Sequence, residues 1–543
     1  MPEHPTISLC MIVRDEEENL PRCLESVKGL VDEIIVVDTG SKDKTREIAR
    51  SFGAKVYQHP WEDDFSKARN ISLSYAASDW ILVLDADEWL DRKYIPKIKK
   101  ILKEAEEYVG VSFVIYSETA TGMGTAHAFK LFKNHEGFYY EGAIHEQLII
   151  HGKILTTKFR IYHSGYNLTP ARAKKKFERS AKLLKDGIEE DPNNFYYRFH
   201  LGRLYLGQEM YQECIREALV ALDISKTVKE VDEATILMIM FDLAYAYFEL
   251  QDYRQAEEVC LKAMSMRPDY PDIILVLGYV YLKMGRREEE IATFKKFIEV
   301  VKQQEEEMPY DNLLVASAGS VDKAYQYIGE AFLKLSRLDE AIANFKLSLE
   351  HNPKNTKVYE SLIRCYQETR EADWIKETCL KALTNEVANA LIYYLLGLIY
   401  KEEKNPEAKN FLQKVIELKP EGIPAYLDLV DIYFEEQEFE PVFPLLDKLR
   451  ELEPKRAYRL YQAMGDKEAV RGDYEGAIRA YNIILANNPE DEGARTGLAR
   501  CQIKLGQYED AQRNYQTLLS VNPHHPEALR LLKLLEELSD RSN

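Results

Sequence analysis

Four prolines in the last quarter of the chain recur at almost constant spacing. Pro420, Pro454, Pro489 and Pro523 are separated by 34, 35 and 34 residues, and Pro353 lies 67 residues before the first of them, close to two periods. A chain that repeats at this period folds as stacked copies of one small unit, because a single unit cannot bury its apolar face alone. The period therefore restricts this part of the chain to a solenoid.

The repeat resembles the tetratricopeptide repeat, a helix pair of 34 residues. Counting back from Pro353, small and aromatic residues occupy the expected packing positions, namely Gly329, Phe332, Ala341 and Phe345. We predict an all-α tetratricopeptide solenoid of about nine repeats over residues 194–543, preceded by a linking helix over 169–193. Such solenoids present a concave groove that commonly holds an extended peptide or a partner helix.

The N-terminal part has a different pattern of apolar residues. Short apolar runs alternate there with helical patterns, which indicates βαβ units and a mostly parallel sheet in an α/β domain over residues 1–168. The run 80–84 is followed at once by Asp85 and Asp87. Ligands of open α/β sheets bind beyond the carboxyl ends of the strands, and two carboxylates there suit Mg²⁺ or Mn²⁺.

Four motifs occur in order across residues 7–90. They are Val13-Arg-Asp-Glu16, Asp38-Thr-Gly-Ser-Lys-Asp43, Ala68-Arg-Asn70 and Asp85-Ala-Asp87. Together they resemble the nucleotide-sugar half of family 2 inverting glycosyltransferases, which have the Rossmann-like GT-A fold. The resemblance implies a donor site for a nucleotide-diphosphate sugar formed by Val13, Arg14, Glu16, Asp38, Arg69, Asp85 and Ala86. In that site, Asp38 contacts the base or ribose, Asp85 the ribose or sugar, and Asp87 binds the metal.

Asp38, Arg14 and the Asp-x-Asp motif also have alternative explanations. Asp38 is well placed to form an Asx-turn ahead of Gly40. Arg14 lies in an acidic loop and could form a structural ion pair. An Asp-x-Asp after a strand also begins some phosphatase sites, although those sites usually follow the first strand.

The acceptor side is predicted near residue 145. The segment Gly142-Ala-Ile-His145-Glu146 resembles one found at this point in similar glycosyltransferases, and either His145 or Glu146 could act as the base. If the two residues alternate on a strand, only one of them faces the site. His163 resembles the histidine that closes the metal shell in GT-A enzymes; its alternative is a strand-end histidine packed under the next helix.

Composition limits the partners. With 72 Lys+Arg against 91 Asp+Glu, the net charge of −19 argues against a nucleic-acid binder. The seven cysteines form no C-x-x-C pair, which indicates a reducing compartment. No apolar run reaches the ~20 residues of a membrane span. We therefore expect a cytoplasmic protein without a transmembrane segment; a homodimer is compatible with the solenoid's large surface.

These observations predict a metal-dependent hexosyltransferase that uses Mg²⁺ or Mn²⁺ and moves a sugar from a nucleotide-diphosphate donor, with a UDP-sugar expected. The architecture resembles bacterial peptide S- and O-glycosyltransferases that act on bacteriocin precursors, which implies a Cys, Ser or Thr acceptor held by the repeat groove. Two alternatives stay open. One is a polysaccharide or lipopolysaccharide transferase, and the other is a repeat scaffold with a silent transferase domain. The sugar, the base and the acceptor atom are not determined by the sequence.

Overall fold

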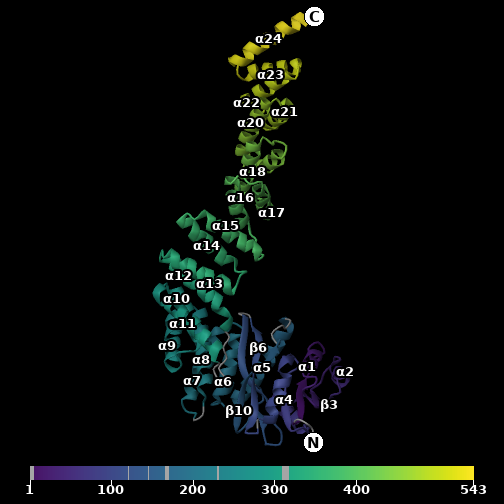
Figure 1. The fold of residues 1–543 in the computed structure, drawn as a ribbon, viewed down its shortest axis with the longest axis vertical. Coiled ribbons are helices and arrows are strands. Elements are labelled where there is room, and N and C mark those ends of the chain that lie inside the picture. Colours follow the sequence, from purple (N-terminus) through teal and green to yellow (C-terminus); the bar gives the residue numbers. More distant parts are fainter. Residues whose placement is uncertain are drawn as a thin grey trace. The chain divides into compact units, whose positions relative to one another are not determined.

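The computed structural model describes residues 5–104, 106–119, 122–144, 146–164, 170–228, 231–307 and 317–542. An eight-stranded sheet forms the N-terminal part (Figure 1). Its strands run in the order β3-β2-β1-β4-β7-β6-β10-β5, and β8 and β9 form a separate pair. The strands are β1 (Ile7–Val13), β2 (Glu33–Asp38), β3 (Lys55–Gln58), β4 (Trp80–Val83), β5 (Glu88–Leu90), β6 (Tyr108–Thr119), β7 (Gly122–Lys133), β8 (Tyr139–Glu141), β9 (Gln147–Ile149) and β10 (Lys153–His163).

The first half of the sheet is parallel, and the second half is mixed. β1 pairs in parallel with β2 and with β4, and β2 pairs in parallel with β3. β7 then runs antiparallel to both β4 and β6, whereas β10 is parallel to β6 and antiparallel to β5. The strands that carry the predicted donor motifs are thus the parallel ones, so their carboxyl ends meet at one edge.

The parallel strands are buried on both faces, as their continuous apolar sequences predict. Leu9 and Met11 of β1 pack in a core with α1 (Leu20–Ser26) and α4 (Ile95–Glu104). Cys10, between them, packs in a second core with Leu73 of α3 (Phe65–Ser74). The remaining helical elements of this part are α2 (Thr45–Ser51) and the short 3₁₀ turn η1 (Arg92–Tyr94). The sheet therefore has a helical layer on each side.

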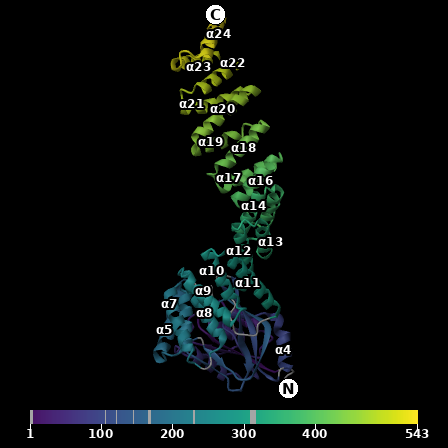
Figure 2. The same ribbon diagram turned by 90° about the vertical axis from the view of Figure 1, so that its left-hand side faces the viewer.

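Antiparallel helices follow the sheet (Figure 2). They are α5 (Pro170–Glu190), α6 (Phe195–Leu206), α7 (Tyr211–Ser225), α8 (Glu233–Glu249), α9 (Tyr253–Met266), α10 (Pro271–Met284), α11 (Arg287–Glu307), α12 (Val321–Lys334, after the 3₁₀ turn η2, Ala318–Ser320), α13 (Leu338–His351), α14 (Thr356–Thr369), α15 (Ala372–Thr384), α16 (Ala390–Glu402), α17 (Glu407–Leu418), α18 (Ile423–Glu436), α19 (Val442–Leu452), α20 (Pro454–Arg471), α21 (Tyr474–Asn487), α22 (Glu492–Lys504), α23 (Tyr508–Val521) and α24 (Pro526–Ser542).

The chain divides into two compact units, residues 1–352 and 353–543. The first unit thus contains the sheet together with the helices up to α13, so the predicted boundary at residue 168 stays a prediction. All seven cysteines are free and buried. In the described residues, no helix has both the length and the apolar character that a membrane crossing demands.

Helices α5 and α6 pack directly on the sheet domain. Ile144, in the segment between β8 and β9, is buried in a cluster with Leu184 of α5 and Leu201 of α6. Phe65, at the start of α3, packs against the same cluster. The junction between the two folds is therefore an apolar core rather than an open linker.

Glycines allow the paired helices to approach closely, as the predicted packing positions require. A Cβ atom on Gly329 in α12 would lie 2.6 Å from Cε1 of Phe345 in α13. The Phe345 ring is fully buried, so it has no space into which to move. A Cβ atom on Gly278 in α10 would meet Phe294 of α11 at the same distance.

We expect Gly329→Ala to lower the free energy of unfolding by about 2 kcal/mol, because overpacking outweighs the gain in helix propensity. Urea unfolding followed by circular dichroism measures the change. Gly202→Ala in α6 is the matched control, since its nearest neighbour would lie at an ordinary 3.4 Å. Equal effects of the two substitutions would contradict the close-approach explanation.

Candidate active site

The loops that follow β1 and β2 are joined at the carboxyl edge of the sheet. The backbone N–H of Asp15 donates to Oγ of Ser41 at 3.0 Å, and the N–H of Lys42 donates to Oδ1 of Asp15 at 2.7 Å. The N–H of Glu16 donates to Oγ1 of Thr45 at 2.7 Å. The two acidic loops thus form one rim, at which the turn after β4 also ends.

The three residues predicted from the first motif have different environments. Val13 is buried, and its carbonyl accepts from the N–H of Thr39 at 3.0 Å. Arg14 is exposed on the rim. Glu16 accepts from Nδ2 of Asn19 at 2.9 Å, while its burial, together with the nearby charges of Asp87 and Asp85, raises its pKa. Glu16 therefore lies close to the Asp-x-Asp turn.

Asp38 forms the Asx-turn that its position ahead of Gly40 predicts. Its side chain is buried, and Oδ1 accepts from the N–H groups of Gly40 and Ser41, both at 3.2 Å. Arg46 Nε lies 4.0 Å from the same carboxylate. These bonds fix the loop after β2, and a contact of Asp38 with a nucleotide stays a prediction.

Asp87 and His163 lie together at the rim. Oδ2 of Asp87 is 3.3 Å from Nε2 of His163, and each side chain is about one-quarter exposed, at 25% and 26%. The hydrogen bond that His163 donates to Asp87 raises the pKa of His163, and Oγ of Ser117 lies 3.2 Å from its Nδ1. Pairing of β10 with β5 places His163 opposite Glu88. The histidine thus faces the turn rather than packing under the next helix.

This pair fits a divalent cation that is shared with a substrate. No group of three or more His, Cys, Asp or Glu side chains arranged for a metal occurs in the described ranges. Mg²⁺ and Mn²⁺ are commonly held by one or two carboxylates, with the remaining positions taken by substrate phosphates and water. A carboxylate and an imidazole with adjacent donor atoms match that kind of site.

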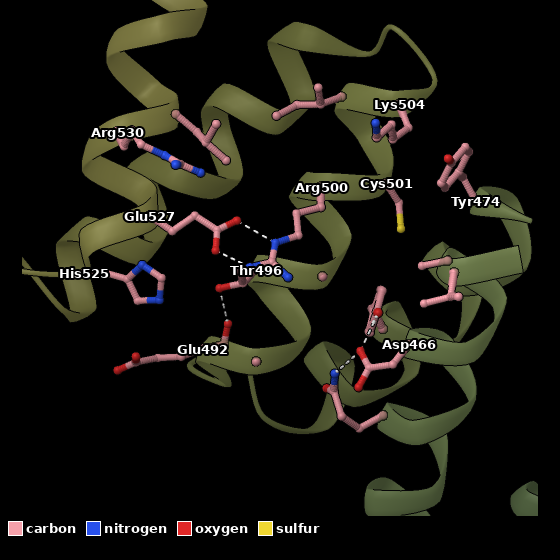
Figure 3. Close-up of a pocket in the computed structure, with 18 residues that line it drawn as sticks. Asp466, Tyr474, Glu492, Thr496, Arg500, Cys501, Lys504, His525, Glu527 and Arg530 are labelled. Carbon is pink, nitrogen blue, oxygen red and sulfur yellow. Dashed lines mark hydrogen bonds and ion pairs between the residues drawn. The ribbon is translucent and has the colours of Figure 1, made fainter. Parts of the chain in front are cut away.

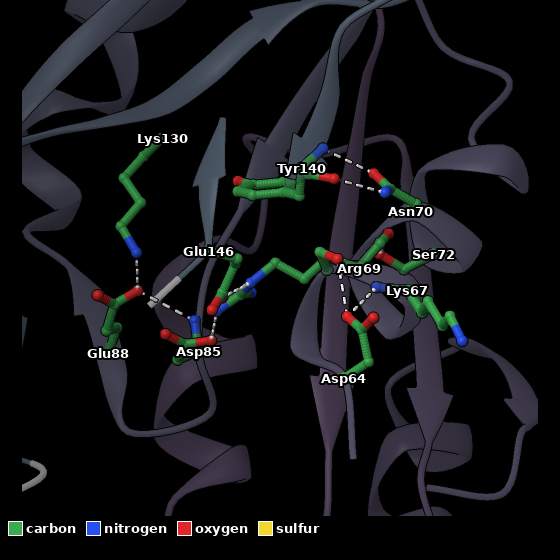
Figure 4. Close-up of polar contacts among 11 residues, drawn as sticks. Asp64, Lys67, Arg69, Asn70, Ser72, Asp85, Glu88, Lys130, Tyr140 and Glu146 are labelled. Carbon is green, nitrogen blue, oxygen red and sulfur yellow. Dashed lines mark hydrogen bonds and ion pairs between the residues drawn. The ribbon is translucent and has the colours of Figure 1, made fainter. Parts of the chain in front are cut away.

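Arg69 connects the residues predicted for the donor side with those predicted for the acceptor side (Figure 4). Its Nη2 donates to Oδ1 of Asp85 at 2.8 Å, and its Nε donates to Oε1 of Glu146 at 2.5 Å. Burial opposes its charge, but the two carboxylates hold the Arg69 pKa above its usual value. Asp85 is desolvated as well, yet the Arg69 and Lys130 charges keep its pKa well below the usual range.

One nitrogen of Arg69 has no partner. Nη1 is buried and makes no hydrogen bond with any described residue. The guanidinium is therefore held at two points by carboxylates, and its third nitrogen is left without a partner among the described residues. Ala86, between the two aspartates, is buried in the core, so its backbone is the part that can reach a ligand.

Local contacts explain why Glu146 reaches Arg69. Asp64 caps α3 by accepting from the N–H of Lys67 at 2.9 Å. Asn70, one residue after Arg69, exchanges two hydrogen bonds of 2.8 Å with the backbone of Tyr140. The segment that follows β8 is thereby tied along α3. His145 lies outside the described residues, so its role stays a prediction.

Two charged residues beside the Asp-x-Asp turn, Lys130 and Glu88, were not predicted from the sequence. Nζ of Lys130 in β7 donates to Oε2 of Glu88 at 2.7 Å, and the same oxygen accepts from the backbone N–H of Asp85 at 3.0 Å. Burial opposes the Lys130 charge, but Glu88 and Asp85 raise its pKa. The available signal was a lysine inside the apolar strand Phe129-Lys-Leu-Phe132.

Comparison with known proteins identifies both parts of the chain. Residues 8–169 match the family model described as glycosyl transferase family 2. Residues 239–270, 271–300, 390–421 and 471–535 match models described as tetratricopeptide repeat. The chain thus carries a family 2 glycosyltransferase domain with the α/β GT-A architecture, followed by an all-α tetratricopeptide solenoid. This result confirms the predicted resemblance and fold class.

Several curated proteins are similar over part of the chain. A TPR repeat-containing protein of Synechococcus elongatus is 37% identical over 212 residues, which is 36% of this chain and 52% of that protein. The SPbeta prophage-derived glycosyltransferase SunS of Bacillus subtilis is 31% identical over 207 residues, 37% of this chain and 49% of SunS. An uncharacterized glycosyltransferase of Rickettsia typhi is 39% identical over 95 residues, 18% of this chain and 32% of its own. This chain spans about half the length of the first two.

Among solved structures, the crystal structure of MamA aligns with 34% of this chain and 94% of its own at 24% identity, with a TM-score of 0.28. That score is too low to support an argument, so the assignment of the repeats depends on the family models and on the helix packing.

We expect Arg69→Met to lower the free energy of unfolding by about 3 kcal/mol, because removing one member of a buried ion-pair group leaves the other charges uncompensated. Thermal unfolding measures the loss. Lys67→Met on the same helix is the control, since its ammonium is 61% exposed and its ion pair with Glu62 is long, at 3.5 Å. A loss no greater than that of the control would show that Arg69 does not hold the site together.

Proposed function

We propose that this protein is a metal-dependent inverting glycosyltransferase that moves a hexose from a nucleotide-diphosphate sugar, with a UDP-sugar as the expected donor. One observation carries the proposal: Asp85, Asp87, His163, Arg69 and Glu146 gather at the carboxyl edge of the parallel strands in a family 2 domain. That edge is where open α/β sheets bind their ligands. The names of SunS and of the Rickettsia relative support the same activity.

The residues divide into donor and acceptor roles. Asp87 and His163 would hold Mg²⁺ or Mn²⁺, which when bound offsets charge on the leaving diphosphate. Asp85 would accept hydrogen bonds from the ribose or the sugar, and Val13, Arg14, Glu16, Asp38 and Ala86 would line the rest of the donor pocket. The unpaired Nη1 of Arg69 is available to an oxygen of the donor.

Glu146 or His145 would remove the proton from the acceptor. Arg69 holds Oε1 of Glu146 at 2.5 Å, so the position of this carboxylate is fixed relative to Asp85. A thiol acceptor would depend less on such a base, since a cysteine of pKa ~8.5 is already partly ionised near neutrality. A hydroxyl acceptor would need the base throughout.

We further propose that the acceptor is a peptide or protein and that the repeats bind it. Support comes from a cavity of about 1030 Å³ along α20, α22 and α24 (Figure 3). Val470, which lines it, is 91% exposed, and Tyr474 lies nearby. An extended peptide with apolar side chains could cover this surface.

Two of the cations that line the cavity would attract an acidic segment, whereas the carboxylates that line it, Asp466, Glu492 and Glu527, already have partners within the chain. Arg500 is engaged by Glu527, with Nε donating to Oε1 at 2.5 Å. Lys504 and Arg530 also line the cavity, and neither makes a hydrogen bond or ion pair with any residue in the part of the chain that the structure describes. These two cations are therefore available for carboxylates of a bound peptide.

The donor proposal predicts metal-dependent release of one nucleotide from a panel of UDP-, GDP- and dTDP-sugars with Mn²⁺. Asp87→Ala should lower this rate about 100-fold or more, because the cation contributes several kcal/mol to the leaving group. Glu18→Ala, an exposed carboxylate on the same rim, is the control. If the parent protein neither binds nor turns over any donor, the transferase domain is silent and the scaffold alternative holds.

The acceptor proposal predicts that Lys504→Glu/Arg530→Glu lowers kcat/KM about tenfold for acidic peptides containing one Cys, Ser or Thr, through lost charge attraction. Donor hydrolysis without acceptor should not change. Arg513→Glu, a 72% exposed position in α23, is the control. Undiminished transfer to peptides after removal of residues 353–543 would refute docking in this groove, and transfer to oligosaccharides alone would favour the polysaccharide alternative.

A further inference from the structure

Lys130 is a buried cation placed beside the Asp-x-Asp turn. Its side chain is 13% exposed and that of its partner Glu88 is 7% exposed. In Figure 4 the Lys130 ammonium points to the Glu88 carboxylate, which lies next to the backbone of Asp85. No motif singled out in the sequence contains this lysine.

An irregularity in the sheet places Lys130 there. In the β6–β7 pairing, Leu131 lies opposite Val111 and Phe129 lies opposite Ser112, so Lys130 has no partner on β6 and is the extra residue of a β-bulge. On its other side, β7 pairs Leu131 with Leu82 of β4, so Lys130 comes level with the end of β4. Bulges commonly redirect a side chain next to an active site.

Glu88 connects Lys130 to the Asp85–Asp87 turn. Its Oε2 accepts from Lys130 and from the N–H of Asp85, and its own N–H donates to the carbonyl of Asp85 at 3.0 Å. Residues 85–88 are therefore closed by a backbone bond and by a carboxylate. Both aspartates of the motif lie on this turn, so its geometry sets the direction of each.

The energetics of the pair favour a role in positioning. Removing two charges from water costs more than their attraction usually returns, so an apolar pair of similar size would stabilise the fold equally well or better. A lysine without a glutamate, or the reverse, would leave a buried charge uncompensated. The pair is thus explained by the backbone N–H of Asp85 that it holds, not by stability.

We propose that Lys130 is a positioning residue that, through Glu88, holds the Asp85–Asp87 turn in the geometry that binds the nucleotide-diphosphate donor. The inference rests on the proposed transferase function. It adds a residue that touches neither the donor nor the metal but decides how well the two aspartates meet them.

Three variants separate positioning from stability. Lys130→Met leaves Glu88 without its cation, Lys130→Arg keeps the charge, and Lys130→Met/Glu88→Leu removes both charges together with the acceptor for the Asp85 N–H. The last variant should unfold at a higher temperature than Lys130→Met, because no buried charge is left unpaired. Lys133→Met on the same strand is the control, since its Nζ binds the carbonyl of Glu106 away from the turn.

The measurement is the dissociation constant for UDP, GDP and dTDP with Mn²⁺, using calorimetry, together with the KM and kcat of the donor that the parent uses. Lys130→Met and the double variant should weaken nucleotide binding and raise KM about tenfold or more, with Lys130→Arg close to the parent. A purely structural pair predicts the opposite for the double variant: restored stability with parental affinity. That result would overturn the proposal.

Amide hydrogen exchange provides a test that needs no ligand. The N–H of Asp85 should exchange about tenfold faster in Lys130→Met than in the parent or in Lys130→Arg, because the acceptor that protects it is no longer held. Parental exchange in Lys130→Met would refute the positioning role, whatever the donor result. A parent protein that binds no nucleotide but shows the faster exchange in the variant would instead refute the proposed function alone.

Discussion

The buried guanidinium of Arg69 is the contact on which the arrangement of the site depends. It joins three parts of the chain that are distant in sequence, namely α3, the turn after β4 and the segment before β9. A buried arginine is tolerated only while its carboxylate partners stay in place. The distance between Asp85 and Glu146 is thereby fixed by one rigid, planar group, and the turn after β4 and the segment before β9 cannot move independently.

A second set of contacts fixes the rim itself. Side chains of the loop after β2 accept from backbone groups of the loop after β1, and Asp38 is occupied with closing its own turn. The polar residues of the rim therefore hold one another before any ligand arrives. Preorganisation of this kind reduces the cost of ordering the site on binding. Asp87 and His163 stay partly exposed within this frame, so a ligand can reach both side chains.

Local patterns in the sequence were enough to predict much of the fold. The apolar runs gave the parallel strands, the Asp-x-Asp position gave the turn after β4, and the prolines and glycines gave the paired helices, with Gly329 against Phe345 as the clearest case. The antiparallel pairing of β7 with β4 and the bulge at Lys130 depend on the register between strands, for which the sequence has no local signal. The pairing of Arg69 with two carboxylates is non-local for the same reason, and Asp38 shows that a motif residue can also be required by its own loop.

The packing of Ile144 and Phe65 against α5 and α6 has a consequence for how such chains can arise. Two folds that share an apolar core cannot be exchanged by recombination at the boundary where the strand and helix pattern gives way to the helical repeats. A new array grafted at residue 169 would lack the surface that covers the segment carrying Glu146, whereas a graft beyond the first helix pair would keep it. Exchange of repeats between such chains should therefore occur farther along the solenoid, with α5 and α6 inherited together with the sheet domain.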